Sequence, residues 1–352
     1  MSASSWLLYG ANGYTGELIA REAVARGMRP TLAGRRRQPI EALAKELDCP
    51  SAVFALDDHT ALVDALQDKR AVLNCAGPFS QTARVMMQGC LATHVHYLDI
   101  TGEVDVFELA RSVHDKAVRA GIVLCPGVGF DVVPTDSLAA HLKHALPDAT
   151  HLSLAFDSRT GFSKGTAKTA IESAGVGLRV RRAGKLVELP LGALRRTIDF
   201  GEGVRNTVAI SWGDVSTAYF TTGIENIEVY TNTSPRALKR MRRANLLRPL
   251  LQKRWLVRLI QKRIERALVN PSRTERDNNP TLLWAEVRNA RGETRIAKLK
   301  TANGYALTVN SSLGILSRLL DQATEPGYFT PTQLVGAEFV TKLPGSSTIR
   351  VE

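Results

Sequence analysis

The sequence lacks several features that would each assign the protein to a particular class. The 352-residue chain contains no run of about 18 uncharged apolar residues, so we expect no segment that spans a bilayer. No basic region followed by an apolar core and a cleavage site comes after Met1, so we expect no secretory signal. The four cysteines are scattered without a Cys-x-x-Cys pair, which argues against a disulfide framework or a zinc cluster and favours a reducing compartment. These absences together predict a cytoplasmic protein.

Acidic residues are scarce in only one part of the chain. The net charge is +12, and residues 234–276 contain 14 lysines and arginines but two acidic residues, which accounts for the whole excess. The rest of the chain is neutral and only 6% of residues are aromatic, so nucleic acid is a poor fit as a partner. Any electrostatic partner is expected at this single segment.

Signatures of metal or nucleophilic catalysis are also missing. His94-x-His96 and His141-x-x-His144 have spacings that could ligate a metal, but no carboxylate or cysteine pattern completes a site. A serine-nucleophile elbow and a phosphate-binding P-loop are absent from the sequence as well. We therefore expect no metal.

The first 125 residues contain alternating strand-like and helical patterns. Strands are expected at Ser5–Tyr9, Thr31–Gly34, Ala52–Leu56, Ala71–Cys75, His96–Ile100 and Ile122–Cys125. Helices are expected at Gly16–Arg26, Pro39–Leu47, His59–Gln67 with Asp58 as N-cap, Thr82–Thr93 and Val104–Ala120. Regular alternation at this spacing predicts an α/β fold with a doubly wound parallel sheet, that is, a Rossmann domain.

After Asp131 the pattern changes. A helix is expected to begin near Pro134. Strand-like runs follow at His151–Phe156, Thr207–Trp212, Val215–Thr221, Ile224–Tyr230, Leu282–Arg288 and Thr294–Lys300, the last two flanking a hairpin turn. Because helices do not alternate with these strands, we expect a mixed or antiparallel sheet. The predicted organisation is a Rossmann domain, residues 1–133, and a second α+β domain for substrate binding or oligomerisation, residues 134–352, whose C-terminal tail could pack back on the first.

A glycine-rich turn joins the first predicted strand to the first helix. Gly10 permits a tight turn, Gly13 permits close approach of a pyrophosphate, and Gly16 permits close packing of helix and strand. The phosphates of a dinucleotide would meet backbone N–H groups at the positive end of the helix dipole. The candidate cofactor-binding residues of this turn are Gly10, Asn12, Gly13, Tyr14, Thr15 and Gly16.

The end of the second strand discriminates between the two nicotinamide cofactors. A carboxylate there would bind the ribose hydroxyls of NAD and repel a 2′-phosphate. The sequence instead has Arg35, Arg36 and Arg37, with no acidic residue before Glu41. Guanidinium groups bind phosphate bidentately and stack on adenine. Arg35 and Arg36 therefore predict NADP(H), whereas Arg37 is expected to be a solvated surface residue.

Four segments, the first of which contains the glycine turn, form a recognisable pattern. They are Tyr9–Gly16, Val72–Phe79, His96–Asp99 and Gly129–Asp136, supported by Gly165–Thr169, Trp212–Asp214 and Gly327–Pro331. In these segments the chain resembles the saccharopine dehydrogenase-like oxidoreductases, and within them the trans-acting enoyl reductase branch, which serves lipid and polyketide synthesis. The resemblance implies an NADPH-dependent oxidoreductase that acts in lipid metabolism.

The segment after the fourth strand is expected to face the nicotinamide end of the cofactor. It lies at the carboxyl end of the strand, beside the switch point of the sheet where ligands bind. The candidate residues are Cys75, Ala76, Gly77, Pro78 and Phe79, and the alternative is a tight strand-to-helix turn without a ligand. Tyr97 and Asp99 alternate on the next strand and point the same way. Asp131 and Asp136 are expected to hold the domain junction by hydrogen bonds.

The chemistry requires a group that stabilises an enolate oxygen and a proton donor. Tyr97, Lys164 and Lys168 are the catalytic candidates, with Thr166 as a further donor. Each lysine could equally be an exposed charge at a helix end. We expect the active site between the two domains. The favoured reaction is reduction of an enoyl or related acyl substrate.

Two alternatives stay open. An opine-type enzyme that forms a C–N bond, as in saccharopine metabolism, would need an arginine cluster, which Arg179, Arg181 and Arg182 could supply. A protein that senses NADP(H) without turnover is the other.

The basic segment has its own alternatives. Residues 246–268 predict a helix with an apolar stripe between basic residues, started or kinked by Pro249. This helix could receive an acyl carrier protein, lie on an acidic membrane surface as part of a membrane-peripheral protein, or pack on its own protein. A homodimer is a further possibility.

Overall fold

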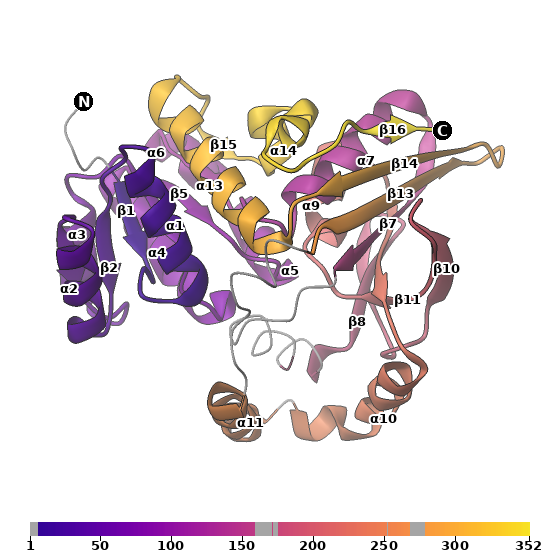
Figure 1. Ribbon diagram of the computed structural model, residues 1–352, viewed down its shortest axis with the longest axis horizontal. Coiled ribbons are helices and arrows are strands. Elements are labelled where there is room, and N and C mark those ends of the chain that lie inside the picture. The colour runs from indigo at the N-terminus through magenta and orange to yellow at the C-terminus, as the bar shows by residue number, and fades with distance from the viewer. Residues whose placement is uncertain (1–5, 159–170, 172–174, 252, 268–278) are drawn as a thin grey trace. The chain divides into compact units, whose positions relative to one another are not determined.

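The computed structural model describes residues 6–158, 171, 175–251, 253–267 and 279–352, and these form two compact units (Figure 1). The first unit consists of Met1–Phe130 and Thr308–Val335, and the second of Asp131–Leu307 and Gly336–Glu352. Each unit is built around its own sheet.

The first unit contains a seven-stranded sheet in the order β15-β6-β5-β4-β1-β2-β3, in which every neighbouring pair is parallel. Its strands are β1 (Trp6–Tyr9), β2 (Thr31–Gly34), β3 (Ser51–Val53), β4 (Ala71–Asn74), β5 (His96–Asp99), β6 (Val123–Cys125) and β15 (Gly327–Tyr328). Six of these strands follow the order β3-β2-β1-β4-β5-β6, which is the order of a Rossmann sheet. The predicted fold class is therefore confirmed.

The helices of the first 125 residues follow the sequence prediction with one exception, whereas the sequence analysis predicted none at Gly304–Asp321 or Pro331–Val335. The helices of the first unit are α1 (Tyr14–Ala25), α2 (Arg37–Glu46), α3 (His59–Leu66), α4 (Phe79–Thr93), α5 (Val104–Ser112), α6 (His114–Ala120), most of α13 (Gly304–Asp321) and α14 (Pro331–Val335). Asp58 caps α3 as predicted, because its carboxylate accepts from the Ala61 N–H at 3.0 Å. The single helix expected at 104–120 is wrong. Val113, at φ −109° and ψ 16°, leaves the helical region and separates α5 from α6.

Residues from late in the sequence complete the first sheet. β15 pairs with β6, and the Tyr328 N–H donates to His114 Nδ1 at 3.0 Å. The start of this segment is also fixed, because Thr308 Oγ1 accepts from the Phe130 N–H (3.0 Å) and the Ser311 hydroxyl donates to the Val128 carbonyl (2.7 Å).

The second unit contains a nine-stranded mixed sheet. Its strands are β7 (Ala149–Ser158), β8 (Leu178–Arg182), β9 (Lys185–Leu189), β10 (Arg195–Asp199), β11 (Val204–Ile210), β12 (Asn226–Asn232), β13 (Thr281–Asn289), β14 (Thr294–Thr301) and β16 (Arg350–Val351). The main path runs β10-β11-β12-β7-β13-β14-β16, and β8 pairs with both β12 and β9. Only the β7–β12 pair is parallel among these strands, so the expected mixed sheet is confirmed.

The two faces of this sheet are covered by different elements. Residues at alternate positions point to opposite faces, so Ala155, Tyr230 and Trp284, which are register partners, share one face. They form a buried cluster with Leu178 and Val180 of β8. Helices α7 (Val133–Ala145) and α9 (Asp214–Thr222) contact each other, and α7 also contacts β7, β13 and β14.

The strand predicted at Val215–Thr221 is wrong, because these residues form α9. The segment is rich in β-branched and aromatic residues, which favour strands by propensity alone. Ser216, Thr217 and Ala218 are buried in the structure, and small side chains permit close approach of α9 to α7. Gly223 ends the helix in the left-handed conformation, at φ +70°.

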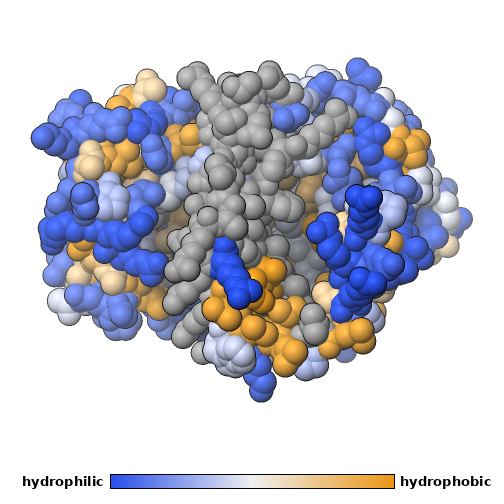
Figure 2. Space-filling view, turned by 60° about the horizontal axis from the view of Figure 1, so that its bottom comes forward, coloured by the Kyte–Doolittle hydropathy of each residue, from blue (hydrophilic) through white to orange (hydrophobic). Residues whose placement is uncertain are grey.

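The basic segment forms two helices rather than one. α10 (Pro235–Leu251) carries Pro249 in its last turn, and α11 (Arg254–Ala267) follows after a short break. Proline lacks a backbone donor and clashes with the preceding turn, which explains why the helix ends within two residues of Pro249. Apolar surface gathers over these helices at the lower centre of Figure 2. Leu268 lies outside the described residues. Among the helices that the structure describes, none is long and apolar enough to cross a membrane.

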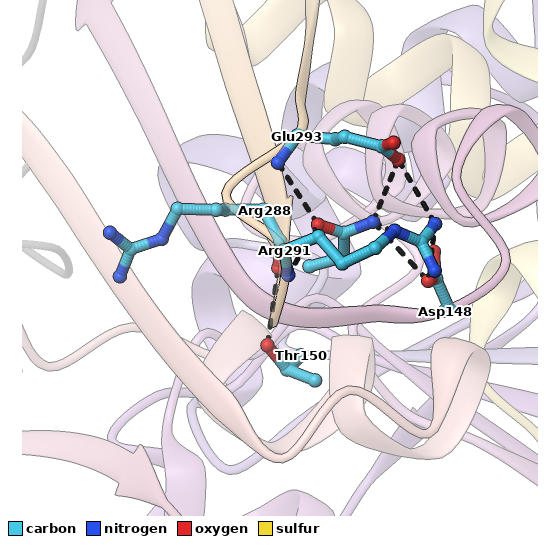
Figure 3. A network of polar contacts seen from close by, with 6 residues as sticks. Asp148, Thr150, Arg288, Arg291 and Glu293 are labelled. Carbon is cyan, nitrogen blue, oxygen red and sulfur yellow. Dashed lines mark hydrogen bonds and ion pairs between the residues drawn. The ribbon is translucent and has the colours of Figure 1, made fainter.

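The β13–β14 hairpin ends in a polar network (Figure 3). Asn289 Oδ1 accepts from the Arg291 and Glu293 N–H groups, both at 3.0 Å, and its amide donates to Glu293 at 2.8 Å. Arg291 pairs with Asp148 at 3.0 Å, which ties the turn to the residue before β7. The hairpin predicted from the sequence is confirmed.

Candidate functional site

The glycine turn lies between β1 and α1, where two strands of the first sheet come together. The N–H groups of Gly10 and Ala11 donate to the Ala33 carbonyl of β2 at 2.8 and 3.1 Å. Gly13 is the exposed N-cap residue of α1 and, being glycine, has no side chain of its own to cap the helix. Tyr14 and Thr15 are half-buried in its first turn. The N-terminus of α1 therefore offers an anion its backbone N–H groups and the positive end of the helix dipole.

The structure requires glycine at two positions of this turn. Gly10 has φ +79°, and a Cβ there would lie 2.8 Å from the Ala76 nitrogen of the loop after β4. A Cβ on Gly16 would lie 2.3 Å from the Gly10 carbonyl oxygen. A Cβ on Gly13 would meet the same oxygen at 3.1 Å, which is tight but less severe. The close packing that the sequence predicted for Gly16 is thus present.

Arg36 connects the end of β2 to the glycine turn. Asn12 Oδ1 accepts from Arg36 Nη2 (2.7 Å) and Nε (3.3 Å) in the amide orientation that satisfies both groups. Arg35, Arg36 and Arg37 are all exposed, and Arg37 pairs with Glu41 at 2.7 Å. Arg35 lies close enough to Tyr9 to oppose the effect of burial, which raises the pKa of Tyr9 to about 12. Two guanidinium groups therefore border the position where a 2′-phosphate would bind.

The loop after β4 is held by Asn74 and Thr82. Asn74 Oδ1 accepts from the Ala76 N–H at 3.0 Å, and the Thr82 hydroxyl donates to the Ala76 carbonyl at 2.7 Å. The Cys75 N–H continues the ladder by donating to the Tyr9 carbonyl at 2.8 Å. The Gly77–Pro78 peptide bond is cis, and Phe79 begins α4. Because Gly10 packs on Ala76, the predicted residues of both loops lie side by side.

Glu103 is a contributor that sequence reasoning missed. Its carboxylate accepts from the Phe79 N–H at 2.8 Å and from the Ser80 N–H at 2.7 Å, and so caps α4. The N-terminus of α4 is therefore already occupied by an anionic side chain. Glu103 is 24 residues from Phe79 in the sequence, so no local pattern could have identified this cap.

Tyr97 and Asp99 point the same way on β5, as predicted, but they lie in the interior. The Tyr97 hydroxyl donates to Asp99 Oδ2 at 2.6 Å, and Asp99 Oδ1 accepts from the N–H groups of Thr101 (3.0 Å) and Gly127 (2.8 Å). Both side chains are fully buried. Burial raises the pKa of Asp99 to about 6 and that of Tyr97 well above its usual value. This geometry favours a structural role for Tyr97 over the catalytic one.

The second unit holds a buried carboxyl pair. Asp136 and Asp214 lie in the first turns of α7 and α9, and neither is exposed to solvent. Asp136 Oδ2 accepts from the Thr221 hydroxyl at 2.9 Å. Burial and then the charge of Asp136 raise the pKa of Asp214 well above its usual value. The sequence analysis expected Asp136 to form hydrogen bonds at the domain junction. Its hydrogen bond with Thr221 lies within the second unit.

The remaining catalytic candidates, Lys164 and Lys168 with Thr166, lie outside the described residues. Two of the three arginines considered for an opine-type site are engaged internally. Arg181 donates to the carbonyls of Val215 (2.6 Å) and Gly184 (2.7 Å) and stacks on Tyr219. Arg182 pairs with Glu228. Among the described residues, no group of three His, Cys, Asp or Glu side chains could hold a metal ion.

Comparison with known proteins identifies the type of nucleotide site. Residues 6–125 match the saccharopine dehydrogenase NADP binding domain family. Together with the close-packed glycine turn and the arginines after β2, this match makes residues 6–125 an NADP-binding domain, and the cofactor predicted from the sequence is confirmed.

Curated relatives extend the similarity beyond this domain. A probable mitochondrial saccharopine dehydrogenase-like oxidoreductase of Arabidopsis thaliana is 30% identical over 214 residues, which cover 54% of this chain and 46% of the relative. The mouse saccharopine dehydrogenase-like oxidoreductase is 28% identical over 37% of this chain and 35% of its own length. A trans-acting enoyl reductase of Mycobacterium ulcerans is 28% identical over 41% and 37%, respectively. The chain thus aligns with less than half the length of these relatives, and the resemblance seen in the sequence is confirmed.

Two solved structures have folds similar to that of this chain over nearly its whole length. The apo saccharopine dehydrogenase (L-Glu forming) of Saccharomyces cerevisiae superposes with a TM-score of 0.64 at 14% identity, and the match covers all of both chains. The homospermidine synthase of Legionella pneumophila in complex with NAD gives 0.67 at 10% identity, covering 99% of this chain and 91% of that one. At such low identity the likeness describes the fold alone.

Proposed function

We propose that this chain, whose residues 6–125 are an NADP-binding domain of the saccharopine dehydrogenase type, is an NADPH-dependent reductase of enoyl or related acyl compounds. The observation that carries the proposal is the contact between Arg36 and Asn12. It places a guanidinium group beside the turn that receives the pyrophosphate. A cofactor bound there would have its 2′-phosphate and its pyrophosphate held by adjoining residues.

The chain's own residues would then orient the cofactor. The N–H groups at the start of α1 would hold the pyrophosphate, and Arg35 and Arg36 would hold the 2′-phosphate. The loop Cys75–Phe79, which lies against Gly10, would border the nicotinamide half of the cofactor. The bound NADPH supplies the hydride.

The choice of an acyl substrate rests on two supports. One relative, from Mycobacterium ulcerans, is named a trans-acting enoyl reductase. The second support is the state of Arg181 and Arg182, whose guanidinium groups already have partners within the second unit. A substrate with several carboxylates would need cations that are free to bind it, so the opine-type alternative is the weaker one.

The decisive experiment follows NADPH oxidation with three substrate panels. These are enoyl thioesters, the matching saturated thioesters, and amino acids combined with keto acids. We expect oxidation with the enoyl thioesters alone, and a Gly10→Ala variant should abolish it if the purified chain is responsible. Turnover of amino acid plus keto acid would contradict the acyl assignment. Tight NADPH binding without turnover in any panel would contradict an enzyme and favour an NADP(H) sensor.

A further inference from the structure

Exposed apolar side chains are concentrated on α10 and α11. Leu246 is 83% exposed, Leu250 51%, Trp255 67% and Leu259 45%. The other large apolar side chains that are exposed in the described part of the chain, Val118, Val204 and Val351, are scattered. Because α10 and α11 contact each other, the four side chains belong to one surface, which Figure 2 shows as apolar with hydrophilic side chains at its margins. We call these four residues the apolar patch.

The orientation of α10 is fixed by contacts on its opposite side. Asn245 accepts from the Leu191 N–H (2.8 Å) and donates to the Leu191 carbonyl (3.0 Å). Arg248 donates to the Val176 carbonyl and lies 3.5 Å from Glu188. These bonds hold one side of α10 against residues 176–191 of the second unit, so Leu246 and Leu250 face solvent as a consequence of the fold.

The outward side of α10 is both basic and apolar. Lys239, Arg243, Leu246 and Leu250 follow one another at intervals of four, three and four residues, which places them on one side of a helix. All four are exposed. In α11, Trp255 and Leu259 are one turn apart and exposed, whereas Val257 between them is buried.

The charge around the patch is of one sign. Residues 235–267, which include α10 and α11, contain twelve lysines and arginines and a single acidic residue, Glu265. The described basic side chains that are exposed here are Arg236, Lys239, Arg240, Arg242, Arg243, Lys253 and Arg263. The chain thus presents a strongly positive surface with protruding leucines and a tryptophan at its centre.

An anionic lipid surface fits this combination better than other occupants. A second copy of the chain would bring two positive surfaces together, and like charges repel. A protein partner would need a shaped pocket for a leucine that is 83% exposed, whereas a bilayer accommodates protruding apolar groups without one. Tryptophan favours the headgroup level of a membrane, and lysine and arginine bind anionic headgroups there.

We propose that α10 and α11 form a peripheral binding surface for anionic lipid bilayers. The apolar patch enters the boundary between headgroups and acyl chains, and the surrounding basic side chains bind lipid phosphates. The interaction adds to the proposed reductase function and is independent of it.

Vesicle binding tests this proposal with the full chain. The protein is floated with phosphatidylcholine vesicles and with vesicles that also contain phosphatidylglycerol, at low and high salt. We expect flotation only with the anionic vesicles, weakened by salt because the attraction is screened. Trp255 reports insertion, since Trp6 and Trp284 are only 2% and 4% exposed and Trp212 is half-buried. Its emission should shift to the blue with anionic vesicles, and Trp255→Phe should remove that shift.

Matched variants separate the patch from general effects. Leu246→Ser with Leu250→Ser is compared with Val204→Ser, which alters an exposed apolar residue on β11. Lys239→Glu with Arg243→Glu is compared with Lys185→Glu with Arg195→Glu, which makes the same change of charge elsewhere on the second unit. We expect each patch pair to weaken partitioning at least about tenfold, since each basic residue near an anionic surface contributes about fivefold. Unchanged thermal midpoints confirm that the variants are folded.

Three results would overturn the proposal. One is equal flotation with neutral and anionic vesicles. The second is equal loss of binding in the patch variants and their controls. The third is a concentration-dependent dimer that Leu246→Ser with Leu250→Ser disrupts in a protein that binds no vesicles, because the patch would then be a contact between copies of the chain.

Discussion

Arg36 has two structural roles in the first unit. It is the N-cap residue of α2, and its guanidinium group reaches Asn12 in the glycine turn. Arg37, the next residue, turns instead to Glu41 on the surface of α2. The sequence predicted this division between a cofactor-binding Arg36 and a solvated Arg37 from the lack of an acidic residue after β2. It could not predict the Asn12 contact, which depends on how two loops meet.

Replacing Arg36 with alanine should weaken binding of NADPH far more than binding of NADH. A charge-assisted hydrogen bond contributes about 1.5–3 kcal/mol, so we expect the Kd for NADPH to rise roughly 10- to 100-fold. Calorimetric titration with both cofactors measures this, and Arg35→Ala should give a similar loss. Arg37→Ala is the matched control, with little change expected for either cofactor. Equal losses for NADPH and NADH in Arg36→Ala would contradict the assignment of a 2′-phosphate site.

Gly10→Ala should eliminate cofactor binding, and a control at Gly121 can show whether backbone strain or a steric clash is the cause. Both Gly10 and Gly121 have positive φ, +79° and +68°, so alanine is strained at either position. A Cβ on Gly10 would also lie 2.8 Å from the Ala76 nitrogen, whereas nothing lies within 4 Å of one on Gly121. We expect Gly121→Ala to lower the thermal midpoint but to retain NADPH affinity. Loss of NADPH affinity in Gly121→Ala as well would show that strain, rather than the close approach of the two loops, explains the effect.

Helix α9 shows where local propensity fails at the level of a whole element. Val215, Tyr219 and Phe220 made the segment resemble a strand, and only Gly223 signalled the end of a helix. Its packing on α7, through buried small residues, decides the outcome. By contrast, the β13–β14 hairpin was predicted correctly because the information is local, in the alternating strands and the Asn289–Glu293 turn.

The capping of α4 by Glu103 can be tested as a property of that helix. Loss of a helix cap costs about 0.5–2 kcal/mol, so Glu103→Ala should lower the free energy of unfolding by that amount. Urea unfolding followed by circular dichroism measures the change. Glu41→Ala, which removes an exposed pair with Arg37, should cost less than about 0.5 kcal/mol. If the two variants were equally destabilised, the Glu103 carboxylate would not be an effective cap.

At the scale of the whole molecule, the buried carboxyl groups make stability depend on pH. Burial raises the pKa of Asp99 from 3.8 to about 6, so the folded chain binds this proton more tightly than the unfolded chain. The resulting stabilisation is complete below about pH 4 and is lost as the pH rises through about 6. A shift of this size corresponds to about 3 kcal/mol. The raised pKa of Asp214 acts in the same direction.

The test is the unfolding free energy of the wild type minus that of Asp99→Asn, measured from pH 4 to pH 7. We expect this difference to fall with rising pH by up to about 3 kcal/mol, because all other groups titrate equally in both proteins. Asp64→Asn, at an exposed position on α3, is the control for the exchange of aspartate for asparagine itself. A flat profile for Asp99→Asn would mean that Asp99 is ionised in the folded protein at little cost.

Whether a feature of the fold could be predicted from the sequence depends on how far apart in the chain its interacting residues lie. Alternating strands and helices over the first 125 residues predicted the Rossmann sheet, because each βα unit carries its own pattern. The place of Gly327–Tyr328 in the same sheet depends on a pairing with Val123 and Leu124, about 200 residues earlier, which no local pattern encodes.

That pairing constrains how the protein is made on the ribosome. Translation delivers β1 to β6 first, and then the strands of the second unit, before β15 emerges. Throughout that interval the outer edge of β6 has no strand beside it from this chain, and an open edge invites pairing with other chains. The nascent protein therefore has to protect one edge of its nucleotide-binding sheet until Gly327 and Tyr328 have been synthesised.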